Sequence, residues 1–411
     1  MLTLHLIFLK IFFLLIIETK FIPMSFYGVE FTLIELVVLG LLLLVFIYQI
    51  YFYTRYIQGV LRLRTAANKG KVAFQTEQPP VSVIICAKDE VDNLRKYLPF
   101  VLEQEYPDFE VIVVNDGSTD ETEDLLTDLK KTYSNLRSTF VPVGVTNLST
   151  KKLALTLGIK AAKNDWLLFT DADCMPEDKT WISRMARNFN PGVEFVLGYG
   201  AYMKKKGFVN RLITYDTLFI ALQYMGFALT GKPYMGVGRN MAYRKDVFFR
   251  NKGFASNLNL RSGDDDLMVN RAANGFNTKI EVAPDSVTWS EPNKRFRDWY
   301  YQKERHLSVA SFYKAQSRFR LSLEPVTRGL FYVCFLLAMV FGSLITMIVA
   351  GVLLLARLVV QMVVINRSSK HFDGRKYIFM LPVFDIILPL ITLFLLTFGR
   401  MGSKAKNIQW K

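Results

Sequence analysis

Residues 36–53, LVVLGLLLLVFIYQIYFY, form an uncharged apolar run that is long enough to cross a membrane as one helix. A second run extends from residue 329 to residue 365 and is interrupted by one charge, Arg357. As a single helix it would be about 55 Å long, nearly twice the ~30 Å hydrocarbon core, so we expect two spans joined by a turn. The sequence therefore predicts a membrane protein.

Two further apolar segments are weaker candidates for membrane helices. The N-terminal segment, residues 1–30, is interrupted by Lys10 and lacks both a basic leader and a small-residue cleavage site, so we do not expect a removable signal peptide. It fits either a weak first span or a helix at the membrane interface. Residues 377–398 form the last candidate, which two prolines and Asp385 weaken.

The distribution of basic residues predicts the orientation in the membrane. Five Lys or Arg side chains follow the first run before any acidic residue occurs, which places the following region on the cytoplasmic side. Basic residues between 367 and 376 fit the same side. The tail after Phe398 is also basic, so three full crossings in the C-terminal part would put positive charge outside. We therefore expect one of those segments to be re-entrant or interfacial.

A formal net charge of +15 would also suit a nucleic-acid-binding protein. The chain has no basic helix, zinc-ligand spacing or RNA-binding aromatic signature, however, and basic residues beside membrane spans attract anionic lipid. We therefore expect membrane lipid, and no nucleic acid, as the partner of these charges. The three cysteines, Cys86, Cys174 and Cys334, have no paired spacing of the metal or redox type, which fits a reduced cytosolic domain. The sequence does not predict an oligomeric state.

Residues 80–320 alternate between apolar strands and amphipathic helices. Ser118 and Glu121 have capping-box spacing at the start of one of these helices. Strands that are apolar throughout predict an α/β fold with a mostly parallel sheet that helices cover on both faces. The strands are expected at residues 81–87, 109–114, 138–143 and 166–170, and one of the helices at residues 151–162.

Acidic residues follow three of these expected strands. Ligands of parallel α/β sheets bind beyond the carboxyl ends of the strands, so we expect these acids to converge on one edge. A pair of carboxylates with D-x-D spacing suits Mg²⁺ or Mn²⁺, which take their other ligands from substrate phosphates and water. Simple turn chemistry is the alternative explanation for such a pair. The acids are Asp89 and Glu90, Asp116, and the pair Asp171 and Asp173.

Six motifs occur in the order typical of one known family, over about residues 83–306. They are VSVIICAKDE, VIVVNDGSTDET, KKLAL, FTDADCMP, SGDDDLMVNR and QKERH. With them the chain resembles the membrane-bound family 2 glycosyltransferases, such as hyaluronan, chitin, cellulose and poly-N-acetylglucosamine synthases. The resemblance implies a cytoplasmic domain of the Rossmann-like GT-A fold flanked by transmembrane helices, with a nucleotide-sugar as donor.

The resemblance also implies which residues bind the donor. Asp116 would contact the base or ribose, Asp171 would orient the nucleotide, and Asp173 would hold the Mg²⁺ or Mn²⁺ that bridges the diphosphate. Lys151 would reach the nucleotide or a phosphate. A turn with a helix cap explains Asp116 equally simply, and an exposed lysine at a helix start explains Lys151. The full expected set at the nucleotide is Asp116, Asp171, Lys151, Ala87 and Glu90, with Asp173 at the metal.

Catalysis is expected at SGDDDLMVNR and QKERH. The resemblance makes Asp265 the general base, which the chemistry requires because a sugar hydroxyl is a poor nucleophile near neutral pH. Gln302 and Arg305 match the signature Q-x-x-R-W, and a guanidinium can stabilise the departing diphosphate. The final tryptophan is replaced by His306, which predicts single additions or short products. Stabilisation by a helix dipole is the alternative explanation for the acidic run 264–266.

Two other regions are expected on the acceptor side. YMGVGRNMAYRK, residues 234–245, resembles the loop and strand that face the acceptor, where Gly236 and Gly238 would permit close backbone approach; a simple turn is the alternative. Residues 208–229 and 295–315 look like helices along the membrane surface, with burial in the core as the alternative for the first.

The main hypothesis is an inverting, metal-dependent transferase that moves a sugar from a UDP-linked donor to a lipid-linked or polysaccharide acceptor at the cytoplasmic face. A noncatalytic sugar-nucleotide-binding subunit of a polysaccharide assembly system is the alternative, although Asp173, Asp265 and Arg305 occur together. Sparse intramembrane charge disfavours a transporter, and the missing P-loop disfavours an ATP-driven pump. The expected order is a weak apolar segment at 1–30, a transmembrane helix at 31–55, a basic linker at 56–79, the GT-A domain with interfacial helices at 80–320, a transmembrane region at 327–400 and a basic tail at 401–411.

Overall fold

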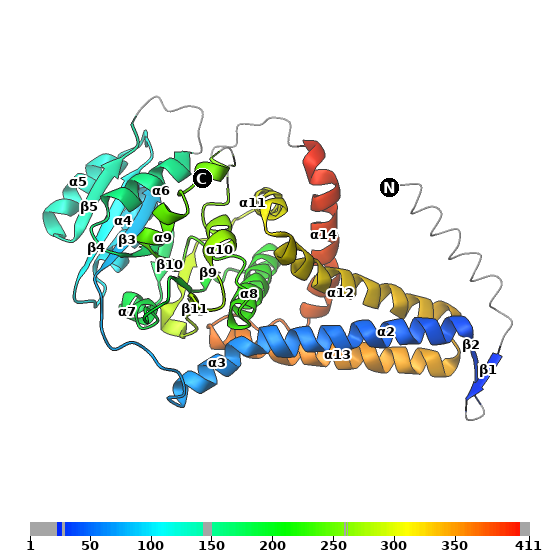
Figure 1. Ribbon diagram of the computed structural model, residues 1–411. Coiled ribbons are helices and arrows are strands. Elements are labelled where there is room, and N and C mark those ends of the chain that lie inside the picture. Colours follow the sequence, from blue (N-terminus) through cyan, green and yellow to red (C-terminus); the bar gives the residue numbers. More distant parts are fainter. Residues whose placement is uncertain (1–22, 27–28, 143–149, 259, 261, 403–411) are drawn as a thin grey trace. The chain divides into compact units, whose positions relative to one another are not determined.

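The computed structural model describes residues 23–26, 29–142, 150–258, 260 and 262–402 (Figure 1). The chain divides into two units. We call Met1–Thr54 with Arg320–Val364 the helical unit, and Arg55–Phe319 with Ile365–Lys411 the sheet unit. Most of the expected N-terminal segment and of the basic tail lies outside the described residues.

The central sheet of the sheet unit has seven strands in the order β11-β8-β10-β6-β3-β4-β5. Neighbours β6, β3, β4 and β5 run parallel, as do β11 and β8, whereas β10 is antiparallel to both of its neighbours. The expected α/β fold with a mostly parallel sheet is therefore confirmed. The strands are β3 Val81–Ala87, β4 Phe109–Asn115, β5 Leu136–Phe140, β6 Trp166–Phe169, β8 Phe195–Leu197, β10 Met241–Arg244 and β11 Thr278–Ile280.

Helices cover the faces of this sheet, which is why β3 is buried along its whole length. Trp181 lies fully buried in the same core as Leu94 and Val113. Helix α6 begins at the expected place and packs against β3 and β4. These helices are α4 Val91–Leu102, α5 Thr122–Thr132, α6 Thr150–Ala161, α7 Trp181–Ala186 and α9 Lys245–Arg250.

The expected capping box at the start of α5 is wrong. The helix begins at Thr122, and Glu121 in the N-cap position makes no side-chain capping hydrogen bond. The Ser118 hydroxyl instead accepts from the backbone N–H of Asp89, 3.0 Å away. Ser118 therefore ties the turn after β4 to the turn after β3, a contact between strands that local spacing does not reveal.

A second, three-stranded sheet was not predicted. Strand β12, Thr288–Ser290, lies between β7, Cys174–Pro176, and β9, Gly200–Tyr202. It pairs antiparallel with β7 and parallel with β9. Because β7 directly follows the D-x-D pair, this sheet fixes the chain that leaves the acidic edge.

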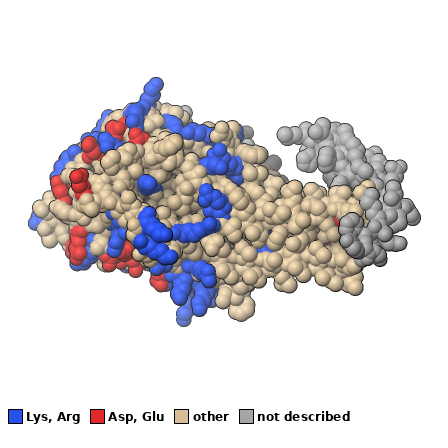
Figure 2. All heavy atoms as spheres, turned by 60° about the horizontal axis from the view of Figure 1, so that its bottom comes forward, with Lys and Arg blue, Asp and Glu red and all other residues tan. Residues whose placement is uncertain are grey.

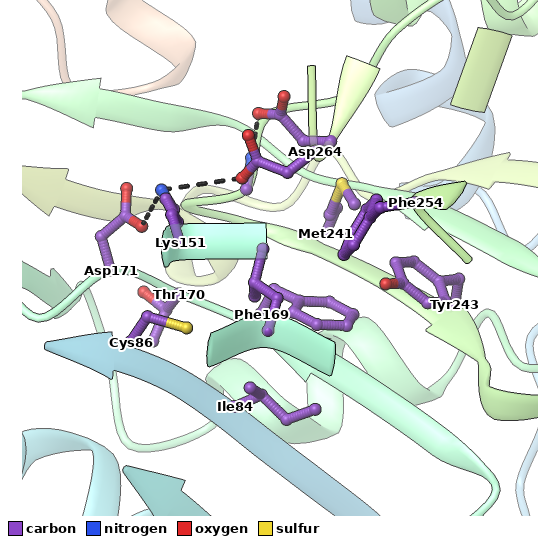
Figure 3. Close-up of a pocket in the computed structure, with 13 residues that line it drawn as sticks. Ile84, Cys86, Lys151, Phe169, Thr170, Asp171, Met241, Tyr243, Phe254 and Asp264 are labelled. Carbon is purple, nitrogen blue, oxygen red and sulfur yellow. Dashed lines mark hydrogen bonds and ion pairs between the residues drawn. The ribbon is translucent and has the colours of Figure 1, made fainter. Parts of the chain in front are cut away.

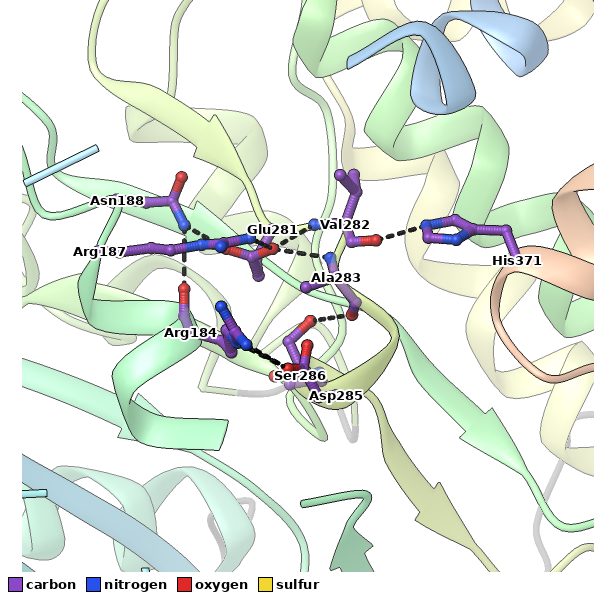
Figure 4. Close-up of polar contacts among 10 residues, drawn as sticks. Arg184, Arg187, Asn188, Glu281, Val282, Ala283, Asp285, Ser286 and His371 are labelled. Carbon is purple, nitrogen blue, oxygen red and sulfur yellow. Dashed lines mark hydrogen bonds and ion pairs between the residues drawn. The ribbon is translucent and has the colours of Figure 1, made fainter. Parts of the chain in front are cut away.

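A buried carboxylate holds the end of β11 against the segment that follows α7 (Figure 4). Glu281 accepts from Arg187 Nε at 2.8 Å and Nη2 at 2.6 Å, and from Asn188 Nδ2 at 2.7 Å. It also accepts from the backbone N–H groups of Val282 and Ala283, at 2.8 and 2.7 Å. A buried charge with an ion-pair partner and this many donors is well compensated, so we read Glu281 as a structural residue.

The sheet unit contains further helices. Helix α8, Phe208–Leu229, is largely buried within the unit, so core burial explains its apolar sequence and the membrane-surface interpretation is wrong for it. Helix α10, Asp266–Ala272, starts at the acidic run as expected. The others are α3 Gln58–Asn68, α11 Phe296–Val309 and α14 Leu381–Gly402.

The helical unit contains α2, Leu33–Phe52, and most of α12, Ala315–Phe341, and α13, Leu344–His371. These helices are long and apolar enough to cross a membrane, and α12 and α13 separate at Gly342 as the length of the second run predicts. A hairpin of β1, Pro23–Phe26, and β2, Val29–Thr32, precedes α2. In the space-filling view Lys and Arg gather on the sheet unit, whereas the visible surface of the helical unit is nearly free of charge (Figure 2).

Candidate active site

Lys151 joins two acidic segments that are far apart in the sequence (Figure 3). Its Nζ lies 3.2 Å from Asp171 Oδ1, just beyond β6, and 3.7 Å from Asp264 Oδ2, just before α10. Burial works to lower the pKa of the Lys151 ammonium, but the two carboxylates outweigh it, so the pKa is raised. Lys151 therefore brings Asp171 together with Asp264, an acid that was not expected from the strand ends. The convergence of Asp89, Glu90 and Asp116 on the same place stays a prediction.

The D-x-D pair has the chemistry of a divalent metal site. One ligand atom each from Asp171, Asp173 and Cys174 lies within 4.8 Å of the others. Burial and the neighbouring Asp171 raise the pKa of Asp173, which indicates negative charge in excess of its compensation. Cys174 is engaged otherwise, because its thiol donates to Asp173 Oδ1 at 3.5 Å and shares a hydrogen bond with Ser290. The two carboxylates fit Mg²⁺ or Mn²⁺, which prefer oxygen ligands.

The three acids before and in α10 differ in their surroundings. Asp265 accepts from the backbone N–H of Gly238 at 2.7 Å and from that of Asp266 at 2.8 Å. Burial and the negative charge of Asp264 raise the pKa of Asp265 to about 6. Burial and Asp265 raise that of Asp266 to about 8, although the Tyr313 hydroxyl donates to it at 2.7 Å. Because the pKa is raised less for Asp265 than for Asp266, Asp265 is the better candidate for a base.

Gly238 contacts the candidate base, whereas the close backbone approach to an acceptor that was expected of it stays a prediction. Its N–H group points at Asp265, and a Cβ atom there would lie 3.5 Å from the same carboxylate. This contact brings the loop before β10 to the candidate base.

The pocket beside Lys151 is lined by only some of the residues that were expected to bind the nucleotide. Asp116 is buried at the end of β4, and its N–H donates to the carbonyl oxygen of Ala87 at 2.8 Å. Glu90 accepts from the Asn93 side chain. The pocket lining, as far as the structure describes the chain, does not include four of the expected residues: Asp116, Ala87, Glu90 and Asp173. The lining consists of Ile84, Cys86, Lys151, Leu155, Phe169, Thr170, Asp171, Gly238, Met241, Tyr243, Phe254, Asp264 and Asp265 (Figure 3).

Helix α11 brings its two expected residues to different places. Arg305 acts on Asp171, whose pKa it helps to lower, so its guanidinium lies near the acidic edge. Gln302 is engaged elsewhere: its amide nitrogen donates to the Tyr202 hydroxyl at 2.9 Å, and its oxygen accepts from Asn293 at 2.8 Å. His306 is exposed on the same helix.

Lys152 is a residue of the site that the sequence did not single out. It is fully buried, and its ammonium donates to the carbonyl oxygens of Asn257, Leu260 and Ser262 at 2.6, 2.7 and 2.8 Å. It thereby fixes the segment that carries the acidic run. The side chains of adjacent residues on a helix point about 100° apart, so at most one of the two lysines in KKLAL can face the donor. The sequence does not show which of the two it is.

Arg239 is the second residue that was missed. It follows Gly238 in the loop quoted as facing the acceptor, yet it acts on both Asp171 and Asp173. No sequence signal separates it from the other basic residues of GVGRNMAYRK, because its neighbours come from strands β6, β7 and β9.

A mostly parallel sheet with an acidic edge that fits a divalent metal ion is consistent with the GT-A class of glycosyltransferases. The structure of mannosyltransferase PcManGT from Pyrobaculum calidifontis, in complex with GDP-Man and Mn²⁺, matches 90% of this chain and 100% of that chain, with a TM-score of 0.56 and 19% identity. At that identity the similarity shows the fold, which is GT-A. Residues 82–250 match the family Glycosyl transferase family 2, so the chain contains a glycosyltransferase domain of family 2.

Two sequence relatives agree with this domain. Poly-beta-1,6-N-acetyl-D-glucosamine synthase of Staphylococcus epidermidis is 30% identical over 138 residues, which are 33% of this chain and 32% of that protein. The probable glycosyltransferase YdaM of Bacillus subtilis is 26% identical over 276 residues, 63% of this chain and 62% of that protein. The matched part thus spans between a third and somewhat under two thirds of these relatives.

Proposed function

We propose that this chain is an inverting, metal-dependent glycosyltransferase that moves a sugar from a UDP-linked donor to a lipid-linked or polysaccharide acceptor. The observation that carries the proposal is the position of Lys151 between Asp171 on the donor side and Asp264 beside the candidate base. One lysine thus links the residues expected to bind a diphosphate with those expected to activate an acceptor. A polysaccharide synthase among the relatives and a neighbour bound to GDP-Man and Mn²⁺ support the same reaction class.

Asp173, assisted by Asp171, would hold Mg²⁺ or Mn²⁺. When bound, such an ion neutralises negative charge on a diphosphate leaving group. Asp116, with the backbone around Ala87 and with Glu90, would bind the nucleoside at the ends of β3 and β4.

The reaction that these residues support is a single displacement at the anomeric carbon. The oxygen of an acceptor hydroxyl forms a bond to that carbon while the bond from the carbon to the diphosphate oxygen breaks. The hydroxyl proton passes to the Asp265 carboxylate, and the bonding electron pair leaves with the nucleoside diphosphate. Attack opposite to the leaving group inverts the configuration. Arg305 would stabilise the charge that develops on the diphosphate.

We also propose that the sheet unit lies on the cytoplasmic side of a membrane that α2, α12 and α13 cross. The five basic residues that follow α2 support this orientation. We propose the same domain order as the sequence predicts, with the GT-A domain at 80–320. A reporter fused after Phe398 tests the topology: a cytoplasmic tail requires that one of the C-terminal segments does not cross.

Nucleoside diphosphate release tests the proposed function. Detergent-purified protein would be incubated with a panel of nucleotide-sugars and Mg²⁺ or Mn²⁺, beside Asp173→Asn and the control Asp165→Asn. Asp165 is exposed just before β6, the strand whose other end leads to Asp171 and Asp173. We expect metal-dependent turnover of one donor, its loss in Asp173→Asn and its retention in Asp165→Asn. Donor binding without turnover in the presence of membrane lipid and glycan acceptors would favour the noncatalytic subunit.

The replacement of the signature tryptophan by His306 leads to a separate expectation about product length. We expect single additions or short products from the active protein. A ladder of long polymer on a gel would contradict this part of the proposal and leave the transferase activity intact.

A further inference from the structure

The guanidinium of Arg239 is held by two uncharged partners. Its Nη2 donates to the carbonyl oxygen of Gly200 at 3.1 Å, and its central carbon lies 4.3 Å from the centre of the Tyr202 ring. Both partners belong to β9, in the small sheet. Stacking of this kind orients an arginine without neutralising it.

The ring that supports Arg239 is itself fixed in place. The Tyr202 hydroxyl accepts from the side-chain amide of Gln302, whose oxygen accepts from Asn293. Gln302, expected to take part in catalysis, therefore contacts Tyr202, which in turn supports Arg239. A continuous set of contacts leads from α11 through β9 to this guanidinium.

Arg239 lies close to the D-x-D pair but retains an unused donor. The ring on which it stacks, Tyr202, pairs with Ser290 in β12, and Ser290 pairs on its other side with Cys174, the residue that follows Asp173. The Nη1 atom of Arg239 is buried and has no hydrogen-bond partner within the part of the chain that the structure describes. Burying a donor without a partner costs free energy, and an oxygen atom of a ligand is the partner that would remove this cost.

Lys151 provides the contrast. Its ammonium already contacts two carboxylates, at 3.2 and 3.7 Å, so much of its charge is compensated within the protein. Arg239 forms no ion pair with any residue that the structure describes, and its two contacts are uncharged, which leaves its positive charge for a ligand that is an anion. Phosphate is the anion that best matches a guanidinium, because its oxygens accept two parallel hydrogen bonds from the fork.

We propose that Arg239 binds the diphosphate of the donor directly, and that Tyr202 and Gln302 act as positioning residues that hold the guanidinium for this contact. The proposal rests on the proposed function, in that it takes a nucleotide-sugar as the donor. It assigns the phosphate contact to the loop before β10, which the resemblance led us to expect on the acceptor side.

Calorimetric titration of the full-length protein with inorganic pyrophosphate and with UDP, each with Mn²⁺, tests the contact. We expect Arg239→Ala to weaken both by about 10-fold or more, because a charge-assisted hydrogen bond is lost. Arg239→Lys keeps the charge but not the fork and should fall in between. The matched control is Arg250→Ala, since Arg250 is exposed and paired with Glu194.

Titration with Mn²⁺ alone separates phosphate binding from a role in metal binding or folding. Removing a cation beside the D-x-D pair should leave the affinity for Mn²⁺ unchanged or increase it. Equal losses of Mn²⁺ and pyrophosphate affinity in Arg239→Ala and Arg239→Lys would overturn the proposal, and so would pyrophosphate affinity within twofold of wild type. A wild-type protein that binds no nucleoside diphosphate would instead refute the proposed function itself.

The positioning role has its own test. Tyr202→Phe keeps the ring and loses the bond to Gln302, whereas Tyr202→Leu loses the ring as well. We expect pyrophosphate affinity to fall in the order wild type, Tyr202→Phe, Tyr202→Leu, with Tyr202→Leu having little further effect in an Arg239→Ala background. Additive losses in the double variant would show that Tyr202 does not act through Arg239.

Discussion

The two units place their polar groups in opposite ways. In the sheet unit the strands are buried and largely apolar, and most charged groups are exposed or lie at one sheet edge, with Glu281 and Lys152 as buried exceptions. In the helical unit large apolar side chains are exposed, with Leu344 at 73% and Val340 at 69%, while Gln49 and Arg357 are fully buried. This inversion is what a hydrocarbon solvent requires, because apolar surface costs nothing in lipid and polar groups must find partners inside.

Each unit also contains a buried polar network. In the helical unit Arg357 donates to Gln49 at 3.1 Å, and Gln361 donates to the Tyr53 hydroxyl at 2.7 Å. In the sheet unit, Glu281 is neutralised by a forked bond from Arg187. Neither network lies at the acidic edge. We therefore expect substitutions at the acidic edge to change catalysis, and substitutions in the two networks to change stability.

The largest effect should come from the edge itself. Asp265→Asn removes the proposed base and should lower kcat by about 10²–10⁴-fold without changing the melting temperature. Asp266→Asn is the matched control, since the pKa of Asp266 is about 8 and its carboxyl is already mostly protonated at pH 7. Turnover measured as nucleoside diphosphate release decides between them. Equal losses of kcat in both variants would mean that Asp265 and Asp266 act together in catalysis.

Glu281 tests whether a buried network of the sheet unit is purely structural. Glu281→Gln leaves the Arg187 guanidinium without its carboxylate and should cost about 3 kcal/mol, or about 6–12 °C in melting temperature. The control is Asp285→Asn, because the Asp285–Arg184 pair is partly exposed and such pairs contribute at most about 1 kcal/mol. Pyrophosphate affinity of the folded Glu281→Gln protein should match wild type. A selective loss of that affinity would place Glu281 in the site.

The pH dependence of turnover sharpens the assignment at the edge. A base must be deprotonated, and the pKa of Asp265 is raised to about 6, so kcat/KM should be half-maximal near pH 6, approach its maximum about one pH unit above that value, and fall about tenfold per pH unit well below it. Because Asp264 contributes to the increase, Asp264→Asn should move the inflection to lower pH. An inflection that stays in place would assign it to another group.

The smallest effect is expected inside the helical unit. Gln49 donates to the Thr327 hydroxyl at 2.8 Å, and hydrogen bonds between membrane helices are worth only about 0.6–1.7 kcal/mol. Gln49→Leu should therefore lower stability in detergent by about 1 kcal/mol, with pyrophosphate affinity unchanged. Leu344→Ala, at an exposed apolar position, is the control. A loss as large as that in Glu281→Gln would remove the proposed difference between the two networks.

Much of the fold could be predicted from local pattern. Strands β3, β4 and β6 were found because each is continuously apolar, and the long apolar runs led to α2, α12 and α13. Strands β8 and β11 and the small sheet were missed, because three-residue strands are too short for a periodic signal. Helix α8 was placed at a membrane surface because a buried helix and an interfacial one have similar composition.

The site was predicted in part for the same reason. The positions of Asp171, Asp173 and Asp265 follow from strand ends and from a resemblance in their motifs, which are local. Arg239 was missed because its partners lie in a strand whose pairing depends on residues far along the chain. Ser118 was given a capping role because its spacing fits one, whereas its partner is in another turn.

The sequence alone determined that the chain has membrane-length apolar helices, that apolar strands alternate with helices, and that acids follow the strands. These features could be predicted because hydrophobic periodicity depends only on residues that are close together in the sequence. Only the tertiary structure decided that Lys151 faces the acids while Lys152 holds a loop, that Gln302 contacts Tyr202, and that Arg239 lies beside the D-x-D pair. These contacts join residues distant in sequence, and packing of the complete domain selects them.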